Sequence, residues 1–139
     1  MLEQAGVSYP GRANFEVSHH YGIDKIYEFG IVMLTVVNRE YCKKLIIVLP
    51  NQKHPEQYHL KKEETFHVLY GELDLTLNGE LKVLRKGDVC TIERNTKHCF
   101  SSKSGAIIEE LSTNHDSNDS YYTDDNIMKN QERKTIILN

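Results

Sequence analysis

The chain has 139 residues and a formal net charge of −3, with 27% charged and 39% hydrophobic residues, and this length fits one domain with a single core. The negative balance, with basic residues only in pairs such as Lys43-Lys44, excludes a general attraction to nucleic acid or to an anionic membrane. The three cysteines lack Cys-x-x-Cys spacing and are odd in number, which argues against a disulfide framework and for a reducing compartment. No signal peptide pattern or membrane-spanning apolar run is present, so we expect a cytoplasmic protein.

The first third of the chain predicts an arm followed by a hairpin. Residues 1–17 mix Gly, Pro and small residues without a period, and we expect an arm or edge strand before a single domain over residues 18–139. Residues 26–37 are apolar and rich in β-branched side chains, which predicts a strand. After a polar turn, residues 41–49 predict a second strand that ends at a proline, so the two form a long hairpin.

The middle of the chain continues with short strands. Residues 65–70 predict a strand that ends at Gly71, and residues 72–77 alternate polar and apolar side chains. Asn78-Gly79 is a strong signal for a two-residue hairpin turn, from which residues 80–84 return.

The last third adds further strands and a loop. Strands are expected over residues 89–92, from His98 onward, over 106–111 and over 133–138, the last at an edge. Residues 112–125, rich in Ser, Asn and Asp, predict a loop that closes one end of the fold, with a short helix near Asp124. About ten short strands with hardly any helix predict an all-β antiparallel barrel or sandwich.

One stretch concentrates groups that bind metals. Gln57 and His59 are two residues apart, so on an extended segment they share a face, and Glu64 enters from the next strand. His98 supplies a further nitrogen. Two imidazoles, a carboxylate and a neutral amide suit Mn, Zn, Fe or Ni. Without a metal, the same residues would form a hydrogen-bonded polar cluster.

These spacings resemble the two motifs of the cupin superfamily. The first is His-x-His-x-x-x-x-Glu-x-x-x-x-x-x-Gly, and its positions here hold Gln57, His59, Glu64 and Gly71. The second is Gly-x-x-x-x-x-Pro-x-Gly-x-x-His, and its positions hold Gly87, Glu93, Asn95 and His98. The resemblance implies the double-stranded β-helix, a jelly-roll barrel, with Gln57, His59, Glu64 and His98 as metal ligands.

Gln57 departs from the cupin pattern because it replaces the usual first histidine. An amide oxygen is a weaker, neutral ligand for a transition metal. Either metal binding is weakened, or the site shifts and His54 substitutes.

A narrower resemblance is to D-lyxose isomerase-like cupins, whose metal strand His-Phe-His-x-x-Lys-x-Glu-Asp is followed in step by residues 57–65. Their later Glu-Val-Ser and Asn-Asp-rich segments are similar to residues 110–112 and 118–119. This implies an aldose–ketose isomerase in which the metal polarises the sugar carbonyl and stabilises an enediolate. It implies Lys62 and Glu110 in proton transfer and substrate contact, with help from Asp119. Lys62 can serve as a base only if its pKa is lowered, and otherwise it is a solvated turn lysine.

Two aromatic residues complete the expected substrate-binding set with Asp119. Tyr70 lies six residues after Glu64 and Phe100 two after His98, so on regular strands each shares its partner's face.

A third resemblance covers nearly the whole chain and gives the alternative function. Residues 18–22, 38–45 and 133–135 look like the cupin modules found beside or fused to sialic acid (N-acetylneuraminate) synthase-type enzymes. This implies a non-catalytic module that binds a sugar acid or nucleotide sugar and regulates or docks to a synthase partner. An iron-dependent dioxygenase is disfavoured because no feature points to an oxidisable substrate. In either function we expect a homodimer that covers the unpaired strand edges, with strand exchange by the N-terminal residues.

Overall fold

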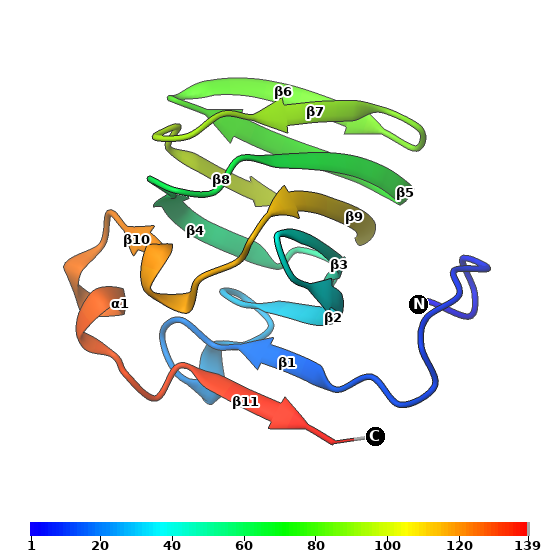
Figure 1. Ribbon diagram of the computed structural model, residues 1–139, viewed down its shortest axis with the longest axis horizontal. Helices are drawn as coiled ribbons and strands as arrows, with labels where there is room; N and C mark the ends of the chain where they lie inside the picture. The colour runs from blue at the N-terminus through cyan, green and yellow to red at the C-terminus, as the bar shows by residue number, and fades with distance from the viewer. Residues whose placement is uncertain (139) are drawn as a thin grey trace.

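The structure is a computed structural model that describes residues 1–138 (Figure 1). Eleven strands run through these residues, together with one short α-helix and two 3-10 turns. The strands are β1 (Phe15–Ser18), β2 (Ile31–Asn38), β3 (Tyr41–Val48), β4 (Lys53–Tyr58), β5 (Glu64–Leu77), β6 (Glu80–Arg85), β7 (Val89–Ile92), β8 (His98–Ser101), β9 (Ala106–Thr113), β10 (Tyr121–Tyr122) and β11 (Lys134–Ile137). The helices are α1 (Asp125–Lys129), η1 (Ile23–Lys25) and η2 (Ser117–Asp119).

The strands form an antiparallel sheet that curls on itself, which confirms the predicted all-β jelly-roll class (Figure 1). Their order is β10-β4-β8-β5-β9-β3-β2-β1-β11, with β6 and β7 also paired to β5. The first half of β5 pairs with β7 and β9, and its second half pairs with β6 and β8. One long strand therefore joins the two layers of the fold.

The bend in β5 corrects the prediction that this strand ends at Gly71. The strand continues through Gly71, whose φ is +77°, after a register shift between Val68 and Tyr70. A Cβ at Gly71 would lie 2.1 Å from the carbonyl oxygen of Gly105, so only glycine fits this close approach of two chains. The glycine marks the corner where the strand changes layer.

The core consists of two apolar clusters on opposite faces of the sheet. The larger one fills the space between the layers and includes Phe66, Val68 and Phe100. The smaller one, around Leu34 and Ile107, is covered by the N-terminal residues.

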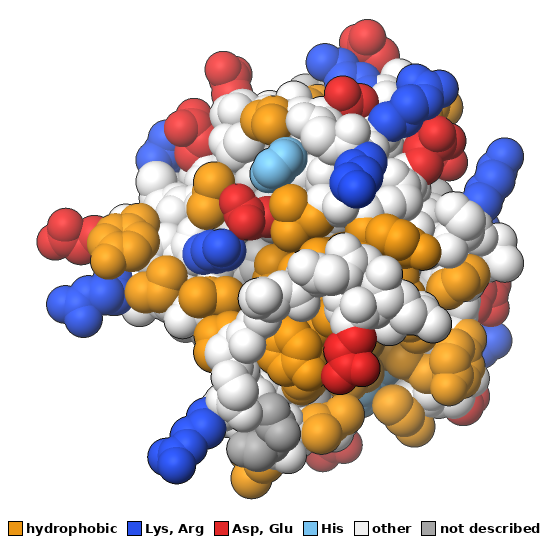
Figure 2. All heavy atoms as spheres, turned by 90° about the vertical axis from the view of Figure 1, so that its right-hand side faces the viewer, with side chains coloured by type: hydrophobic (Ala, Val, Ile, Leu, Met, Phe, Trp, Pro, Cys, Tyr) orange, Lys and Arg blue, Asp and Glu red, His pale blue; other side chains and the backbone are white. Residues whose placement is uncertain are grey.

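The N-terminal segment packs against the rest of the fold, and its last residues enter β1. Met1, Leu2 and Tyr9 pack on the smaller cluster, and β1 pairs with both β2 and β11. Figure 2 views the molecule from the side on which the N-terminal segment lies in Figure 1. On this face, hydrophobic side chains (orange) are visible around and beneath the backbone (white). The segment closes an apolar face that β2, β3 and β9 would otherwise leave open.

The expected strand over residues 26–37 begins later than predicted. Residues 23–25 form η1, and β2 starts at Ile31. Gly30 lies so close to Ile26 and to the Ser18 backbone that any Cβ there would clash. This close packing occurs at the residue directly before the start of β2. The hairpin of β2 and β3, the turn at Asn78-Gly79 and the short helix after Asp124 are present as predicted.

Two further expectations concern cysteines and membranes. Cys42, Cys90 and Cys99 are all free, and Cys42 is buried. Within residues 1–138, no helix has the length and apolar character needed to cross a membrane.

Candidate active site

Three side chains converge between the two layers at one end of the fold. His59 follows the end of β4, Glu64 starts β5 and His98 starts β8. One atom from each of the three lies within 4.8 Å of the others, and all three side chains are buried. The structure thus brings together three of the four predicted metal ligands.

Backbone carbonyls orient both imidazoles. Nδ1 of His59 lies 2.9 Å from the carbonyl oxygen of Asp119, and Nδ1 of His98 lies 2.9 Å from that of Thr96. Because a carbonyl only accepts hydrogen bonds, each Nδ1 carries the hydrogen of its neutral ring. Each Nε2 therefore presents a lone pair, which is the form that binds a metal.

Both lone pairs face the carboxylate of Glu64. Its Oε1 lies 3.0 Å from Nε2 of His98 and 3.6 Å from Nε2 of His59. Neither Nε2 atom and neither oxygen of Glu64 has a hydrogen-bond partner of acceptable geometry among the described residues. Oε2 of Glu64 faces the ammonium group of Lys62 at 3.2 Å, but the two Nε2 atoms and Oε1 face one another. Three buried acceptor atoms in this arrangement are costly unless a cation or a proton lies between them. The residues present therefore fit a divalent metal with nitrogen and oxygen ligands.

The pKa values reflect this cluster of acceptors. Burial lowers the pKa of His59 to about 4, although the carboxylate of Glu64 opposes the shift. For His98 burial also disfavours the protonated ring, but Glu64 outweighs it and the pKa is raised. Burial works against ionisation of Glu64, yet Lys62 and His98 hold the pKa of that carboxyl well below its usual range.

Gln57 and His54 line the same cavity as His59. Gln57 faces His98 across the β4–β8 pair, and no hydrogen bond of its side-chain amide is seen among residues 1–138. His54 stacks on Phe100 with ring centroids 4.7 Å apart, and its Nδ1 lies 2.8 Å from the carbonyl oxygen of Pro55. His54 does not belong to the three-residue cluster of His59, Glu64 and His98.

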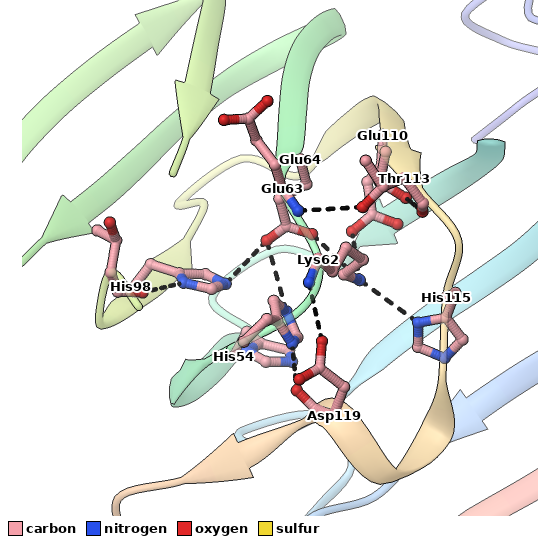
Figure 3. Close-up of polar contacts among 12 residues, drawn as sticks. His54, Lys62, Glu63, Glu64, His98, Glu110, Thr113, His115 and Asp119 are labelled. Atoms are coloured by element: carbon pink, nitrogen blue, oxygen red, sulfur yellow. Dashed lines mark hydrogen bonds and ion pairs between the residues drawn. The ribbon is translucent and has the colours of Figure 1, made fainter. Parts of the chain in front are cut away.

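Lys62 lies beside the cluster in a buried ion-pair network (Figure 3). Its Nζ is 3.2 Å from Oε2 of Glu64, 3.4 Å from Oε1 of Glu110 and 3.4 Å from Nδ1 of His115. Burial alone would lower its pKa, but the two carboxylates outweigh burial and raise it. The interpretation of Lys62 as a solvated turn lysine is wrong, and the lowered pKa that a lysine base requires is also absent.

Glu110 enters the barrel from β9, while its neighbour Glu109 faces outward and pairs with Lys43 at 3.3 Å. Burial, with Glu64 as the next cause, raises the pKa of Glu110 to about 7. Its Oε2 has no hydrogen-bond partner among the described residues. Glu110 therefore offers a buried carboxyl oxygen beside the metal cluster.

Asp119 is placed differently from the substrate contact that was expected. Its carboxylate accepts hydrogen bonds from the backbone N–H groups of Leu60, Lys61 and Lys62 at 2.9 to 3.1 Å. The backbone carbonyl oxygen of Asp119 also accepts the hydrogen bond from Nδ1 of His59. Asp119 therefore fixes the turn between His59 and Glu64. These contacts hold the backbone that carries His59 and Lys62, and Asp119 is not among the residues that line the cavity.

Of the two predicted aromatic contacts, Phe100 lines the cavity and Tyr70 does not. The expectation that Tyr70 shares the face of Glu64 is wrong. The register shift after Val68 reverses the alternation of β5, so that Tyr70 is exposed on the outside.

The cavity extends beyond the predicted residues to a set of basic and hydroxyl side chains. These are Ser18, Lys44, Ser117, Ser120, Tyr122, Arg133 and Lys134. Lys44 gave a usable signal, because it precedes an apolar run and shares a strand face with Ile46. The others come from segments that only the tertiary fold brings together. The cavity volume is about 40 Å³, which is room for roughly three water molecules.

Comparison with known proteins agrees with this geometry. The family model described as Cupin domain matches residues 44–112. A D-lyxose ketol-isomerase of Thermofilum sp. is 32% identical over 160 residues, covering 93% of this chain and 88% of the relative. A D-lyxose/D-mannose isomerase of Thermosediminibacter oceani is 29% identical over 147 residues, covering 85% of this chain and 81% of the relative.

Solved structures show the same fold at low sequence identity. A mutant L-ribose isomerase of Acinetobacter sp. DL28, in complex with L-ribose, has a TM-score of 0.73 and 14% identity, covering 91% of this chain and 88% of that one. L-ribose isomerase of Cellulomonas parahominis without ligand has a TM-score of 0.72 and 15% identity, with 91% and 88% covered. At these identities the likeness concerns the fold.

Proposed function

Since the chain belongs to the cupin superfamily and is homologous to D-lyxose ketol-isomerases, we propose that it is a metal-dependent aldose–ketose isomerase. The observation that carries the proposal is the placement of the Lys62–Glu110 pair directly beside the His59–Glu64–His98 cluster. An isomerase of this kind needs a cation site and a proton carrier within reach of the same two carbons, and this arrangement offers both.

His59, Glu64 and His98 would hold the metal, with Gln57 as a weaker fourth ligand. The donor set suits Mn, Zn, Fe or Ni. When bound, a divalent cation would polarise the sugar carbonyl and stabilise the negative charge of an enediolate. The backbone carbonyls behind both imidazoles keep the ligands oriented.

Glu110 is the proposed proton carrier. Its unpartnered oxygen accepts the proton from C2 of the aldose and returns it to C1 of the ketose. Lys62 stays an ammonium group between two carboxylates, so it donates hydrogen bonds to the sugar oxygens and offers a route for the hydroxyl proton from O2 to O1. The predicted catalytic pair is kept, with Glu110 as base and Lys62 as donor.

Substrate entry requires movement of the covering segment. The cavity of about 40 Å³ is smaller than a sugar, and residues of the 115–122 segment line it. This segment holds η2 and β10 at one end of the barrel (Figure 1). It would have to move outward to admit the substrate, as active-site loops commonly do.

The alternative of a non-catalytic module beside a sialic acid synthase has less support. The two relatives described above are named isomerases, and the cluster keeps two histidines and a glutamate despite Gln57. The test is incubation with a panel of aldoses in D₂O after loading with Mn, Zn, Fe or Ni. Ketose formation with deuterium at the exchanged carbon supports the isomerase, and the absence of both on every sugar and metal contradicts it.

We also propose a homodimer. The last strand of the sheet order, β11, exposes Ile136 and Ile137, and Leu138 follows it exposed. An apolar edge strand is a ready surface for pairing with a second chain. Light scattering at micromolar concentration should give twice the mass of the chain, and a monomer at all concentrations would oppose this.

A further inference from the structure

A buried lysine that the proposed reaction does not use projects into the cavity from β3. Lys44 is 3% exposed and shares its strand face with the cavity residue Ile46. Its side chain forms no hydrogen bond and no ion pair within 4 Å among the described residues. Burial lowers its pKa, with Glu110 opposing the shift. An unpaired lysine is among the side chains most costly to bury, so its presence there points to a function.

Two more cations line the same cavity. Arg133 donates through Nη1 to the carbonyl oxygen of Asn130 at 2.8 Å and lies 5.4 Å over the ring of Tyr122, but its buried Nε has no hydrogen-bond partner among the described residues. Lys134 pairs with Glu16 at 2.9 Å. These groups come from a single segment at the start of β11.

The charge of the cavity wall is opposite to that of the whole protein. Lys44, Lys62, Arg133 and Lys134 line the cavity, and Glu110 is the one acidic residue among its lining side chains. The complete chain carries a net charge of −3. His115 is affected by this excess of positive charge. Burial is the largest cause that lowers its pKa, and Lys44, Lys62 and Lys134 lower it further, to about 3.

Lys44 and Lys134 come from strands other than those that carry the metal cluster, whereas Arg133 lies 5.4 Å over the ring of Tyr122 on β10. In the sheet order, β4, β8 and β5 lie on one side of β9, and β3 and β11 lie on the other. The first group carries Gln57, Glu64 and His98, and the second carries Lys44 and Lys134. Glu110 lies beside the cluster through Lys62 and is the register partner of Lys44, so a ligand with its carbonyl end at the metal cluster would extend its other end past Glu110 toward Lys44.

We propose that Lys44 and Arg133 form an anion subsite, and that the substrate is a sugar carrying a phosphate or carboxylate at the end remote from its carbonyl. This proposal rests on the proposed isomerase function, of which it names the substrate class. Phosphate and carboxylate share the chemistry that these donors recognise, namely a negative charge with several acceptor oxygens.

Lys44 could instead serve as a counterion for Glu110, its partner in the β3–β9 register. Glu110, however, already pairs with Lys62, and Lys44 is not within 4 Å of it. The neighbouring residue Lys43 provides a matched control, because it faces outward and pairs with Glu109.

The test is calorimetric binding to the metal-loaded protein in low salt. The probes are a neutral pentose, the same pentose 5-phosphate and a hexuronate. We expect the better anionic sugar to bind at least about tenfold more tightly than the neutral pentose, and the comparison of phosphate with uronate identifies the anion. Lys44→Met should remove most of this advantage without changing the affinity for the neutral pentose, and Lys43→Met should change neither.

Equal binding of neutral and anionic sugars would overturn the proposal, and so would an equal loss for both kinds of sugar in Lys44→Met. Arg133→Gln gives a second, independent variant, and should also weaken the anionic sugar selectively. Anion-selective binding without any isomerisation would leave the subsite standing and contradict the isomerase. Isomerisation of neutral sugars alone, with no preference for anionic sugars in binding, would support the isomerase and contradict the anion subsite.

Discussion

Nε2 of His98 lies 3.0 Å from Oε1 of Glu64, while the Nδ1 hydrogen of the same ring is directed at the carbonyl oxygen of Thr96. The ring therefore presents a lone pair to a carboxylate oxygen, with His59 arranged in the same way. This relationship is unfavourable unless a proton or a cation lies between the two groups, and a bound metal would supply that charge.

Removal of a ligand should release the metal. His98→Ala leaves one imidazole and one carboxylate, so we expect metal affinity to fall at least about tenfold, as for loss of other metal-site residues. His67→Ala is the matched control, because His67 lies outside the cluster, with its nearest carboxylate, that of Glu109, at 3.9 Å. Elemental analysis after dialysis measures both. Equal metal content in the two variants would show that His98 is not a ligand.

Gln57→His should strengthen metal binding. The replacement puts an imidazole nitrogen where the wild type offers a neutral amide, and imidazole is the better ligand for Zn, Fe or Ni. We expect affinity to rise by about tenfold or more, measured by competition with a chelator of known affinity. An unchanged affinity would place residue 57 outside the coordination sphere, even though it lines the cavity.

Asp119→Ala should destabilise the turn that carries His59 and Lys62. It removes a buried carboxylate that accepts three backbone N–H groups, and we expect a loss of about 3 kcal/mol in the free energy of unfolding. Asp116→Ala is the control, because that exposed carboxylate caps one N–H of η2 and its loss should cost less. Urea denaturation compares the two, and similar losses would contradict the assigned role of Asp119.

The sequence was most informative where the pattern is local. The two-residue turn at Asn78-Gly79 and the alternation of the hairpin strands depend on neighbours along the chain, and both were predicted. The convergence of His59, Glu64 and His98 was anticipated because the resemblance to cupins supplied the long-range pairing.

What was missed depends on contacts between distant segments. The corner at Gly71 follows from its approach to Gly105, and the outward turn of Tyr70 follows from the register shift before it. The role of Asp119 behind the turn at residues 60–62 likewise needs the folded chain. Neither the register shift nor such an approach leaves a periodic signal in the sequence.

Isotope exchange in a pair of adjacent glutamate variants tests whether the carboxyl group of Glu110 carries the proton between C2 and C1. Metal-loaded wild type, Glu110→Gln and Glu109→Gln are incubated with the preferred aldose in D₂O, and deuterium at the exchanged carbon is followed by NMR. Glu110→Gln should bind metal normally and lose exchange by about 10²- to 10⁴-fold, because it removes the proton carrier and no ligand. Glu109→Gln, which alters the outward-facing carboxylate, should exchange at the wild-type rate. Full exchange by metal-loaded Glu110→Gln would show that Glu110 is not the proton carrier.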